Sequence, residues 1–281
     1  MPELPEVETV RRVIDGALRG QEITQAEVVP DEIVWEGADP AAVRKVLLGR
    51  TVTGVGRHGK LWWVEFDQPG RLYGHLGMSG WVRDLDPGNA LATRLREHGA
   101  MPWEDSEGRP RFLKLLLTGD QGGRIAMTDG RRLARLWLGD EQEPRLMKLG
   151  FDCYRELPDV RKIGEALARR SAPIKAVLLD QSVFAGVGNW IADEVLYQAR
   201  VSPKRPASSL SPSETAAIRA ALESVIALAV EASADASRYP TDWLFHVRWG
   251  GRAGAEEIGG RALVREPVGG RTTAWVPGLQ V

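Results

Sequence analysis

The chain begins Met1-Pro2-Glu3, which places a nucleophile next to an acid. A methionine ahead of proline is normally removed, and its removal would leave Pro2 with a free secondary amine. An α-amino group has a pKa of about 7.7–8.0 against about 10.4 for lysine, so roughly a tenth of it is unprotonated at neutral pH. Such an amine attacks an aldehyde-like carbon to give an iminium ion, and the adjacent Glu3 carboxyl can transfer a proton. The pair predicts covalent catalysis that needs no metal or cofactor.

A glycine-rich turn, DQSVFAGVGNW at residues 180–190, lies between two expected helices. Gly186 and Gly188 let the backbone approach a ligand closely, and Asn189 begins the next helix. The free amide groups and positive dipole end of that helix suit a phosphate group. The same pattern is also typical of a tight turn between helices, so this turn alone leaves both interpretations open.

The composition describes a globular protein of 281 residues, with 43% hydrophobic and 27% charged residues and a net charge of −1. This length favours two domains of ordinary size. We expect no membrane span and, because Glu3, Glu6 and Glu8 occupy the N-terminus, no export signal. Cys153 is the only cysteine, which excludes an internal disulfide and a cysteine zinc cluster and fits a reducing compartment. Local basic clusters remain compatible with nucleic-acid binding despite the net charge.

The elements that must position these residues fall into two groups. Residues 5–19 form an amphipathic helical pattern that ends at Gly20 and would fix the N-terminus against the body. From about 23 to 138 short alternating runs with glycine turns predict a β-sandwich, with a long polar surface loop at 84–110. Helical patterns then occupy 160–168, 174–179, 190–199 and 212 to about 232, and strand-like runs follow residue 240. Strands first and helices second predict an α+β chain of two domains with a cleft between them.

Three motifs together resemble one known family. They are MPELPEVETVRR at residues 1–12, GHLGMSG at 74–80 and GVGNWIADE at 186–194. In this order they resemble the formamidopyrimidine-DNA glycosylase and endonuclease VIII family. The segment GGRTTAWVPGLQ at 269–280 resembles the plant and fungal branch of formamidopyrimidine-DNA glycosylases. The resemblance implies an N-terminal catalytic β-sandwich with a leading helix (1–138), a linker (139–158), a helix-two-turn-helix DNA-binding domain (159–237) and a β-hairpin finger (238–281).

The resemblance also implies a bifunctional DNA glycosylase and abasic-site lyase of base excision repair. Such an enzyme removes oxidised bases and then cleaves the strand by β- and δ-elimination. The implied substrates are formamidopyrimidines, hydantoins and, more weakly, 8-oxoguanine, because the connection at 232–239 is too short for a long loop over that base. The expected partner is double-stranded DNA with oxidised bases or abasic sites. We expect a monomer without cofactor or membrane contact, in the cytoplasm at the nucleoid if bacterial, with a nuclear location also open.

By the same resemblance, several residues acquire roles in catalysis. Pro2 matches the Schiff-base nucleophile and Glu3 the general acid. Glu6 matches a second active-site carboxylate, and Lys60 a lysine for elimination and phosphate contact. The full catalytic set is Pro2, Glu3, Glu6, Lys60 and Arg271.

A second set of residues is expected to contact DNA. A base must leave the stack before it can be attacked, which costs a few kcal/mol. Met78 would fill the vacated space, and Arg131 would contact the orphaned partner base. Leu133 occupies a position where the family usually has a phenylalanine wedge. Asn189 and Arg271 would clamp phosphates. The DNA-binding set is His75, Met78, Arg131, Leu133, Arg170, Lys175, Gly188 and Asn189.

The finger departs from the bacterial pattern, because one cysteine cannot build a four-cysteine zinc site. We predict a zincless hairpin formed by the runs at 244–249 and 271–276, with aromatic side chains in place of the metal as its core. No metal-binding residue is assigned.

Two other interpretations compete with this one. A small tautomerase also uses an N-terminal proline, as a general base, but such chains are much shorter. A catalytically silent, damage-sensing DNA-binding protein could share the scaffold. The Pro2-Glu3 pair and Lys60 favour the enzyme, because a silent relative has no need of them.

Overall fold

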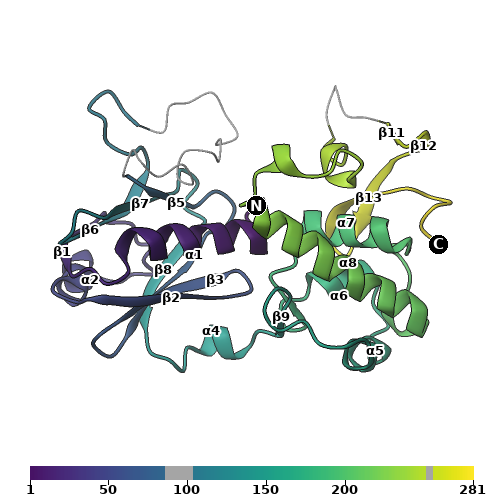
Figure 1. Ribbon diagram of the computed structural model, residues 1–281, viewed down its shortest axis with the longest axis horizontal. Coiled ribbons are helices and arrows are strands. Elements are labelled where there is room, and N and C mark those ends of the chain that lie inside the picture. The colour runs from purple at the N-terminus through teal and green to yellow at the C-terminus, as the bar shows by residue number, and fades with distance from the viewer. Residues whose placement is uncertain (86–103, 251–255) are drawn as a thin grey trace. The chain divides into compact units, whose positions relative to one another are not determined.

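The computed structural model describes residues 1–85, 104–250 and 256–281 (Figure 1). Most of the loop predicted at 84–110 therefore lies outside the described residues. The chain divides into two compact units, Met1–Met147 and Lys148–Val281. The division falls inside the segment 139–158 that the sequence indicated as a linker.

The N-terminal unit is a sandwich of two antiparallel four-stranded sheets, ordered β1-β6-β7-β5 and β2-β3-β4-β8. The predicted β-sandwich is confirmed. Its elements are α1 (Leu4–Leu18), β1 (Ile23–Val28), α2 (Pro40–Leu47), β2 (Val52–His58), β3 (Leu61–Phe66), β4 (Arg71–His75), β5 (Trp81–Asp84), β6 (Leu113–Gly119), β7 (Arg124–Thr128), β8 (Arg135–Gly139) and α4 (Pro144–Met147).

Helix α1 packs against strands of both sheets and leads the chain into the sandwich (Figure 1). Its apolar stripe, which includes Val7, Val10 and Ile14, lies in the core that the two sheets share. Burying each such side chain contributes about 1.5–3 kcal/mol. Because the first turn of α1 belongs to this core, the residues immediately before it are held in place.

Helix α2 was not predicted, because the region from 23 to 138 was expected to contain only strands. The Asp39 carboxylate accepts hydrogen bonds from the backbone N–H groups of Ala41 and Ala42, both at 3.2 Å, and Pro40 occupies the first turn. Val43 and Leu47 form its buried side. An Asp-Pro start is a known helix signal, but eight residues with so few apolar positions gave no clear period.

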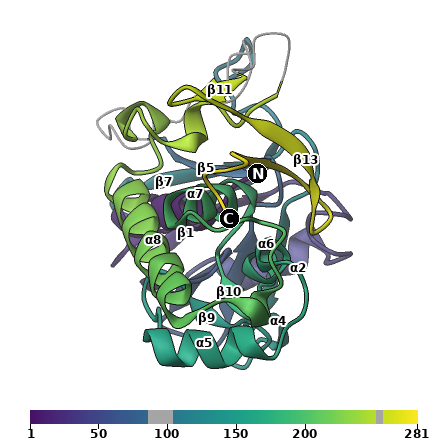
Figure 2. The same ribbon diagram turned by 90° about the vertical axis from the view of Figure 1, so that its right-hand side faces the viewer.

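The C-terminal unit contains the predicted helices, each within a residue or so of its expected bounds. Its elements are β9 (Phe151–Asp152), α5 (Val160–Ala168), α6 (Ile174–Leu179), β10 (Phe184–Ala185), α7 (Asn189–Ala199), η1 (Ala207–Ser209), α8 (Pro212–Glu231), η2 (Ala236–Arg238), η3 (Leu244–His246), β11 (Glu257–Ile258), β12 (Arg261–Ala262), β13 (Val264–Val268) and β14 (Arg271–Trp275). Helix α7 packs against both α8 and β14. Figure 2 shows α7 beside α8.

The hairpin of this unit pairs β13 with β14, so the prediction that residues 244–249 form its first strand was wrong. Leu244–His246 is instead a 3₁₀ turn, and Phe245 packs edge-on against Trp190 and Tyr239. The expected aromatic core was also wrong. The buried cluster at the hairpin is aliphatic and consists of Leu244, Leu263, Ala274 and Val276. Short aromatic runs do not distinguish a strand from a turn that packs on a helix.

In the part of the chain that the structure describes, no helix is both long and apolar enough to cross a membrane.

Candidate functional site

The start of α1 brings three of the predicted catalytic residues together. Glu3 is buried, Pro2 is half-buried, and the Glu3 backbone N–H donates to the Glu6 carboxylate at 3.0 Å. Burial, reinforced by the neighbouring Glu3 carboxylate, raises the pKa of Glu6 to about 7. Glu6 therefore exists in both protonation states at neutral pH, which suits a group that gives or takes a proton.

Lys60 lies in the turn between β2 and β3 and is tied to α1 through Arg57. The buried Arg57 guanidinium donates to the Glu8 carboxylate at 2.9 Å and to the Gly59 carbonyl at 3.0 Å. Burial by itself would raise the pKa of Glu8, but the hydrogen bonds and charges of Arg57 and Arg11 outweigh it and lower that pKa. One guanidinium thus connects the turn that carries Lys60 to the helix that follows Pro2 and Glu3.

His75 ends β4 and pairs with Leu61, the residue after Lys60. Burial, with the positive charges of Lys60 and Arg135, lowers the pKa of His75 to about 4, so the ring is neutral at pH 7. Its Nδ1 accepts a hydrogen bond from the Gly77 N–H at 3.1 Å. The proton of the neutral ring therefore resides on Nε2, which is left as a donor suited to a phosphate oxygen.

Two adjacent turns carry the residues expected to fill the space of an extruded base. Met78 lies in the β4–β5 turn, and Arg131 and Leu133 lie in the β7–β8 loop. Met78 is 45% exposed and Leu133 38%, and Arg131 is exposed too. The Ser79 hydroxyl donates to Asp129 at 2.6 Å and joins the two turns. Exposed apolar side chains on braced turns can insert between bases.

In the C-terminal unit, the start of α7 is hydrogen-bonded to the strand that Arg271 begins. Gly188 caps α7, and the Asn189 side-chain amide donates to the Thr272 carbonyl at 3.0 Å. Arg271 precedes Thr272 and is exposed at the tip of the hairpin, directly after a two-glycine turn with positive φ at both positions. Asn189 Oδ1 is buried and has no hydrogen-bond partner among the described residues. The N-terminus of α7 and the Asn189 amide are therefore linked to β14 at the residue after Arg271.

Lys175 was predicted to bind DNA, and its burial argues against direct contact. Its side chain is 0% exposed, and Nζ donates to Asp193 at 2.6 Å, to Thr273 Oγ1 at 2.7 Å and to the Thr272 carbonyl at 3.3 Å. A buried ammonium with these acceptors cannot reach a phosphate without leaving its site. The structure corrects its role to one of holding β14 against α6 and α7.

Arg170 lies beyond the C-terminus of α5. Its guanidinium donates to the Ala166 carbonyl at 2.5 Å. Among the described residues, no hydrogen bond or ion pair joins Arg170 to Asn189 or Arg271. Its DNA-binding role stays a prediction.

Asp193, at the centre of this ion network, was not predicted from the sequence. One of its oxygens accepts from Lys175, and the other accepts from Arg248 at 2.6 Å and from the Ala274 N–H at 3.2 Å. Asp193 follows Asn189 by four residues and so lies on the same side of α7. This spacing could have indicated that Asp193 lies near Asn189. Nothing in the sequence indicated that Arg248 pairs with Asp193, because Arg248 lies in the segment 244–249 that was expected to be a strand.

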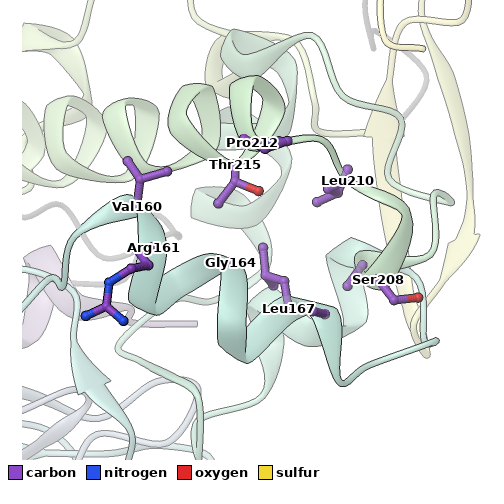
Figure 3. Close-up of a pocket in the computed structure, with 10 residues that line it drawn as sticks. Val160, Arg161, Gly164, Leu167, Ser208, Leu210, Pro212 and Thr215 are labelled. Atoms are coloured by element: carbon purple, nitrogen blue, oxygen red, sulfur yellow. The ribbon is translucent and has the colours of Figure 1, made fainter.

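A pocket of about 570 Å³ lies elsewhere in the same unit, between α5, η1 and α8 (Figure 3). Leu167, Leu210 and Thr215 line it, with Arg161 at one side. None of the predicted site residues lines it. Among the described residues, no three His, Cys, Asp or Glu side chains gather as metal ligands.

Comparison with known proteins agrees with this arrangement. The model of the formamidopyrimidine-DNA glycosylase N-terminal domain matches residues 1–136, and that of the corresponding H2TH domain matches 149–241. A formamidopyrimidine-DNA glycosylase of Arabidopsis thaliana is 38% identical over 283 aligned positions, which cover all of this chain and 71% of the relative.

Two solved structures resemble the whole chain. The Lactococcus lactis enzyme in complex with DNA containing FAPY-dG has a TM-score of 0.78 and 25% identity, with 99% of each chain covered. MutM in complex with DNA containing carbocyclic 8-oxo-G has a TM-score of 0.79 and 27% identity, with complete coverage of both chains.

A β-sandwich led by a helix and followed by an H2TH unit is the domain arrangement of this class of DNA glycosylases. This chain belongs to the formamidopyrimidine-DNA glycosylase family. The Arabidopsis relative also confirms the likeness to the plant branch, since its alignment extends through the finger.

Proposed function

We propose that this chain excises oxidised bases from duplex DNA and cleaves the strand at the resulting abasic site, with Pro2 as the nucleophile. The observation that carries the proposal is the start of α1, where Pro2 precedes a buried Glu3 that is hydrogen-bonded to Glu6. Because the pKa of Glu6 is raised to about 7, its carboxyl group can take up and release a proton near neutral pH. Membership of the family supports the same chemistry.

The reaction begins when the Pro2 amine forms a bond to C1′ of the lesion nucleotide. The bond from C1′ to the base breaks, and the base leaves with the electron pair and a proton from an acid, for which Glu3 is placed. Ring opening, in which O4′ takes up the proton that the Pro2 nitrogen loses, gives an iminium ion between Pro2 and the sugar. The iminium acidifies the C2′ proton. The Glu3 carboxylate, which has given its own proton to the base, can take the C2′ proton, and the C3′–O bond to the 3′ phosphate then breaks by β-elimination. A second elimination expels the 5′ phosphate.

The remaining residues would hold the DNA in the bent form that this chemistry requires. Lys60 and the Nε2–H of His75 face phosphates from the N-terminal unit, and Asn189 with Arg271 does so from the C-terminal unit. Met78, Arg131 and Leu133 occupy the space left by the extruded base. Arg170 would add a phosphate contact, and Gly188 would let a phosphate approach the N-terminus of α7.

The connection between α8 and the finger supports a substrate preference. Between Glu231 and Tyr239 the chain makes two residues of positive φ and one 3₁₀ turn, η2, and Tyr239 is buried. This compact segment leaves little chain to cover a flipped base. Formamidopyrimidines and hydantoins should therefore be better substrates than 8-oxoguanine, and competing turnover on matched lesion duplexes measures the order.

The proposal includes a finger without metal and a monomer that acts where DNA is held, in a bacterial cytoplasm or a nucleus. Elemental analysis after chelator treatment should find no stoichiometric zinc. Gel filtration should give the mass of one chain. Stoichiometric zinc or a stable dimer would contradict these two points.

An incision assay on a panel of lesion duplexes, with and without borohydride, tests the proposed function. Borohydride reduces an imine to a stable amine, so an active enzyme becomes covalently linked to the DNA it is cutting. We expect incision without borohydride and a cross-linked complex with it. A damage-sensing protein would bind the same duplexes with neither result, and that outcome would establish the alternative.

A further inference from the structure

A buried carboxylate, Asp129, lies beneath the two turns that present Met78, Arg131 and Leu133. Its side chain is 1% exposed. One oxygen accepts hydrogen bonds from the Ser79 hydroxyl at 2.6 Å and from the Arg131 N–H at 3.0 Å. The other accepts from the Leu133 and Ala134 N–H groups, both at 2.7 Å. One side chain therefore satisfies the backbone of the β7–β8 loop and holds the β4–β5 turn to it.

The two turns also touch directly through their backbones. Gly77 has a φ of +60°, and a Cβ built there would lie 2.2 Å from the Leu133 carbonyl oxygen. A Cβ at Gly80 would lie 2.9 Å from the Ala134 Cβ. Such an approach is open to glycine alone. The relative placement of Met78 and Leu133 is thus set by backbone contact and by the Asp129 hydrogen bonds.

Arg132, next to Arg131 in the same loop, binds a different partner, so the two arginine side chains have different roles. Arg132 adopts a left-handed backbone with a φ of 56° and donates to Asp31 at 3.0 Å. Asp31 also accepts from Lys114 at 2.8 Å. Arg132 therefore anchors the far side of the loop, while Arg131 is left exposed at its tip.

We propose that Asp129 is a positioning residue that holds Met78, Arg131 and Leu133 in one rigid group, so that all three enter the duplex together. This inference rests on the proposed function, in which these side chains replace an extruded base. Three separately mobile side chains would each lose conformational freedom on insertion. A braced group has lost most of that freedom before DNA arrives, so insertion and base extrusion become more favourable.

Replacement of Asp129 by asparagine tests the idea with almost no change of volume. An amide offers one acceptor oxygen and one NH₂ donor. Whichever way it is oriented, the NH₂ group faces at least one backbone N–H that cannot turn away, of Arg131 or of Leu133 and Ala134. The Asp129→Asn variant should therefore loosen the loop in either orientation.

The experiment compares two substrates that differ in their need for extrusion. On a duplex with a formamidopyrimidine lesion, Asp129→Asn should lower kcat/KM by about tenfold to a hundredfold, the equivalent of one or two buried hydrogen bonds. On single-stranded DNA with a preformed abasic site there is no base to extrude and no opposite strand. Cleavage and borohydride trapping there should stay within about twofold to threefold of wild type, because the proposed chemistry at Pro2 does not use the braced loop.

The matched control is Asp105→Asn. Asp105 also braces a loop, because it accepts hydrogen bonds from the Glu107 and Arg109 N–H groups at 2.9 Å. That segment, residues 105–109, carries none of the predicted site residues. Asp105→Asn should leave the activity on both substrates unchanged. Two further variants, Ser79→Ala and Gly77→Ala, address the same brace from the β4–β5 turn and should show the same selective loss on the duplex.

The outcomes separate this inference from the proposed function. If wild type neither cuts nor traps any lesion DNA, the proposed function fails first. If wild type is active and Asp129→Asn retains full duplex activity, the positioning role is overturned. Equal losses on duplex and single strand would overturn it too, because they would show a general effect on the fold or on catalysis.

Discussion

In the N-terminal unit the candidate side chains stand at the ends of elements, with Pro2 and Glu3 ahead of α1 and Lys60 in a turn. Carboxylates fix their positions. Glu6 accepts a hydrogen bond from the Glu3 backbone, and Glu8 pairs with Arg57, which also binds the turn that carries Lys60. In the C-terminal unit, Asn189 and Lys175 both donate to the carbonyl of Thr272, the residue after Arg271, and Lys175 belongs to a buried ion network with Asp193 and Arg248. The first unit positions its proposed catalytic residues through turns, and the second positions its proposed phosphate contacts through a charged core.

The difference bears on how a basic residue in the sequence is interpreted. Lys60, in a turn of the first unit, keeps its proposed role. A basic residue can also belong to the core, as Lys175 does in the second unit and Arg57 does in the first. Buried ion pairs often contribute little net stability, yet removing one partner is costly because the other charge remains. The variants that follow act on one unit and should leave the other unchanged.

The largest effect is expected from Glu3→Gln in the N-terminal unit. Loss of the acid that protonates the departing base should lower the rate of base release by about 10²- to 10⁴-fold. Duplex binding should persist, because the phosphate contacts remain. Single-turnover excision and a binding titration measure the two quantities. The control is Glu22→Gln, at an exposed position in the same unit. Wild-type excision by Glu3→Gln would remove Glu3 from the mechanism.

Asp193→Asn breaks the charged core of the C-terminal unit. It leaves Lys175 and Arg248 buried without their anion, which should cost about 3–5 kcal/mol of unfolding free energy. Denaturant unfolding of the full chain measures this loss. Duplex affinity should also fall, because the hairpin bearing Arg271 is released, while cleavage of single-stranded abasic DNA changes less. The exposed Asp180→Asn serves as the control. A loss under 1 kcal/mol would mean that the network does not hold the hairpin.

Arg57→Met is the counterpart in the N-terminal unit. It removes the link between Glu8 and the Gly59 carbonyl, and should cost about 2–3 kcal/mol of stability. Because the turn with Lys60 is displaced, elimination on single-stranded abasic DNA should slow, unlike in Asp193→Asn. Arg12→Met provides a matched control, since Arg12 binds the same Glu8 carboxylate at 3.2 Å from a more exposed position. Equal effects of the two variants would refute the positioning of Lys60 by Arg57.

The pH dependence of stability should differ between wild type and Glu194→Gln. Burial raises the pKa of Glu194 from 4.5 to about 7, although the Phe245 N–H donates to its carboxylate. A folded-state pKa above the unfolded value means that the stability contribution is fully present below pH 4.5 and is lost as pH rises through about 7. The stability of Glu194→Gln relative to wild type should thus rise between pH 5 and pH 8, by at most about 3 kcal/mol.

Urea unfolding of both proteins at the two pH values measures this change, with Glu223→Gln on the exposed side of α8 as the control. A difference between Glu194→Gln and wild type that is independent of pH would contradict the raised pKa. Glu6, in the other unit, should contribute the same pH dependence of stability to wild type and to Glu194→Gln, so its contribution cancels in the difference.

The smallest effect is expected from Leu133→Phe. An aromatic ring stacks on bases better than a leucine side chain, so discrimination between opposite bases should sharpen by about threefold to tenfold. The ratio of kcat/KM for lesions opposite C and opposite A is the measurement. The β7–β8 loop should tolerate the change because Leu133 is exposed and Asp129 binds its backbone N–H. An unchanged ratio would mean that Leu133 does not enter the stack.

Much of this arrangement could be predicted from the sequence because its signals are local. The capping pattern at Ser211 to Glu214 set the start of α8, and glycine turns set the strands. The residues that could not be predicted act over long sequence distances. Asp129 meets Ser79 across fifty positions, and Arg248 meets Asp193 across fifty-five. The sequence around a single charged residue does not show whether its side chain is buried. For this reason Lys175 was predicted to contact DNA, and no role was predicted for Asp129.

The most direct test of the account is to locate the borohydride cross-link on the protein. Wild-type enzyme is trapped on a formamidopyrimidine duplex, digested with a protease and analysed by mass spectrometry. The account predicts a processed chain that begins at Pro2, with the sugar remnant on the Pro2 nitrogen. A remnant on Lys60 or another lysine, or a trapped chain that still begins with Met1, would contradict it.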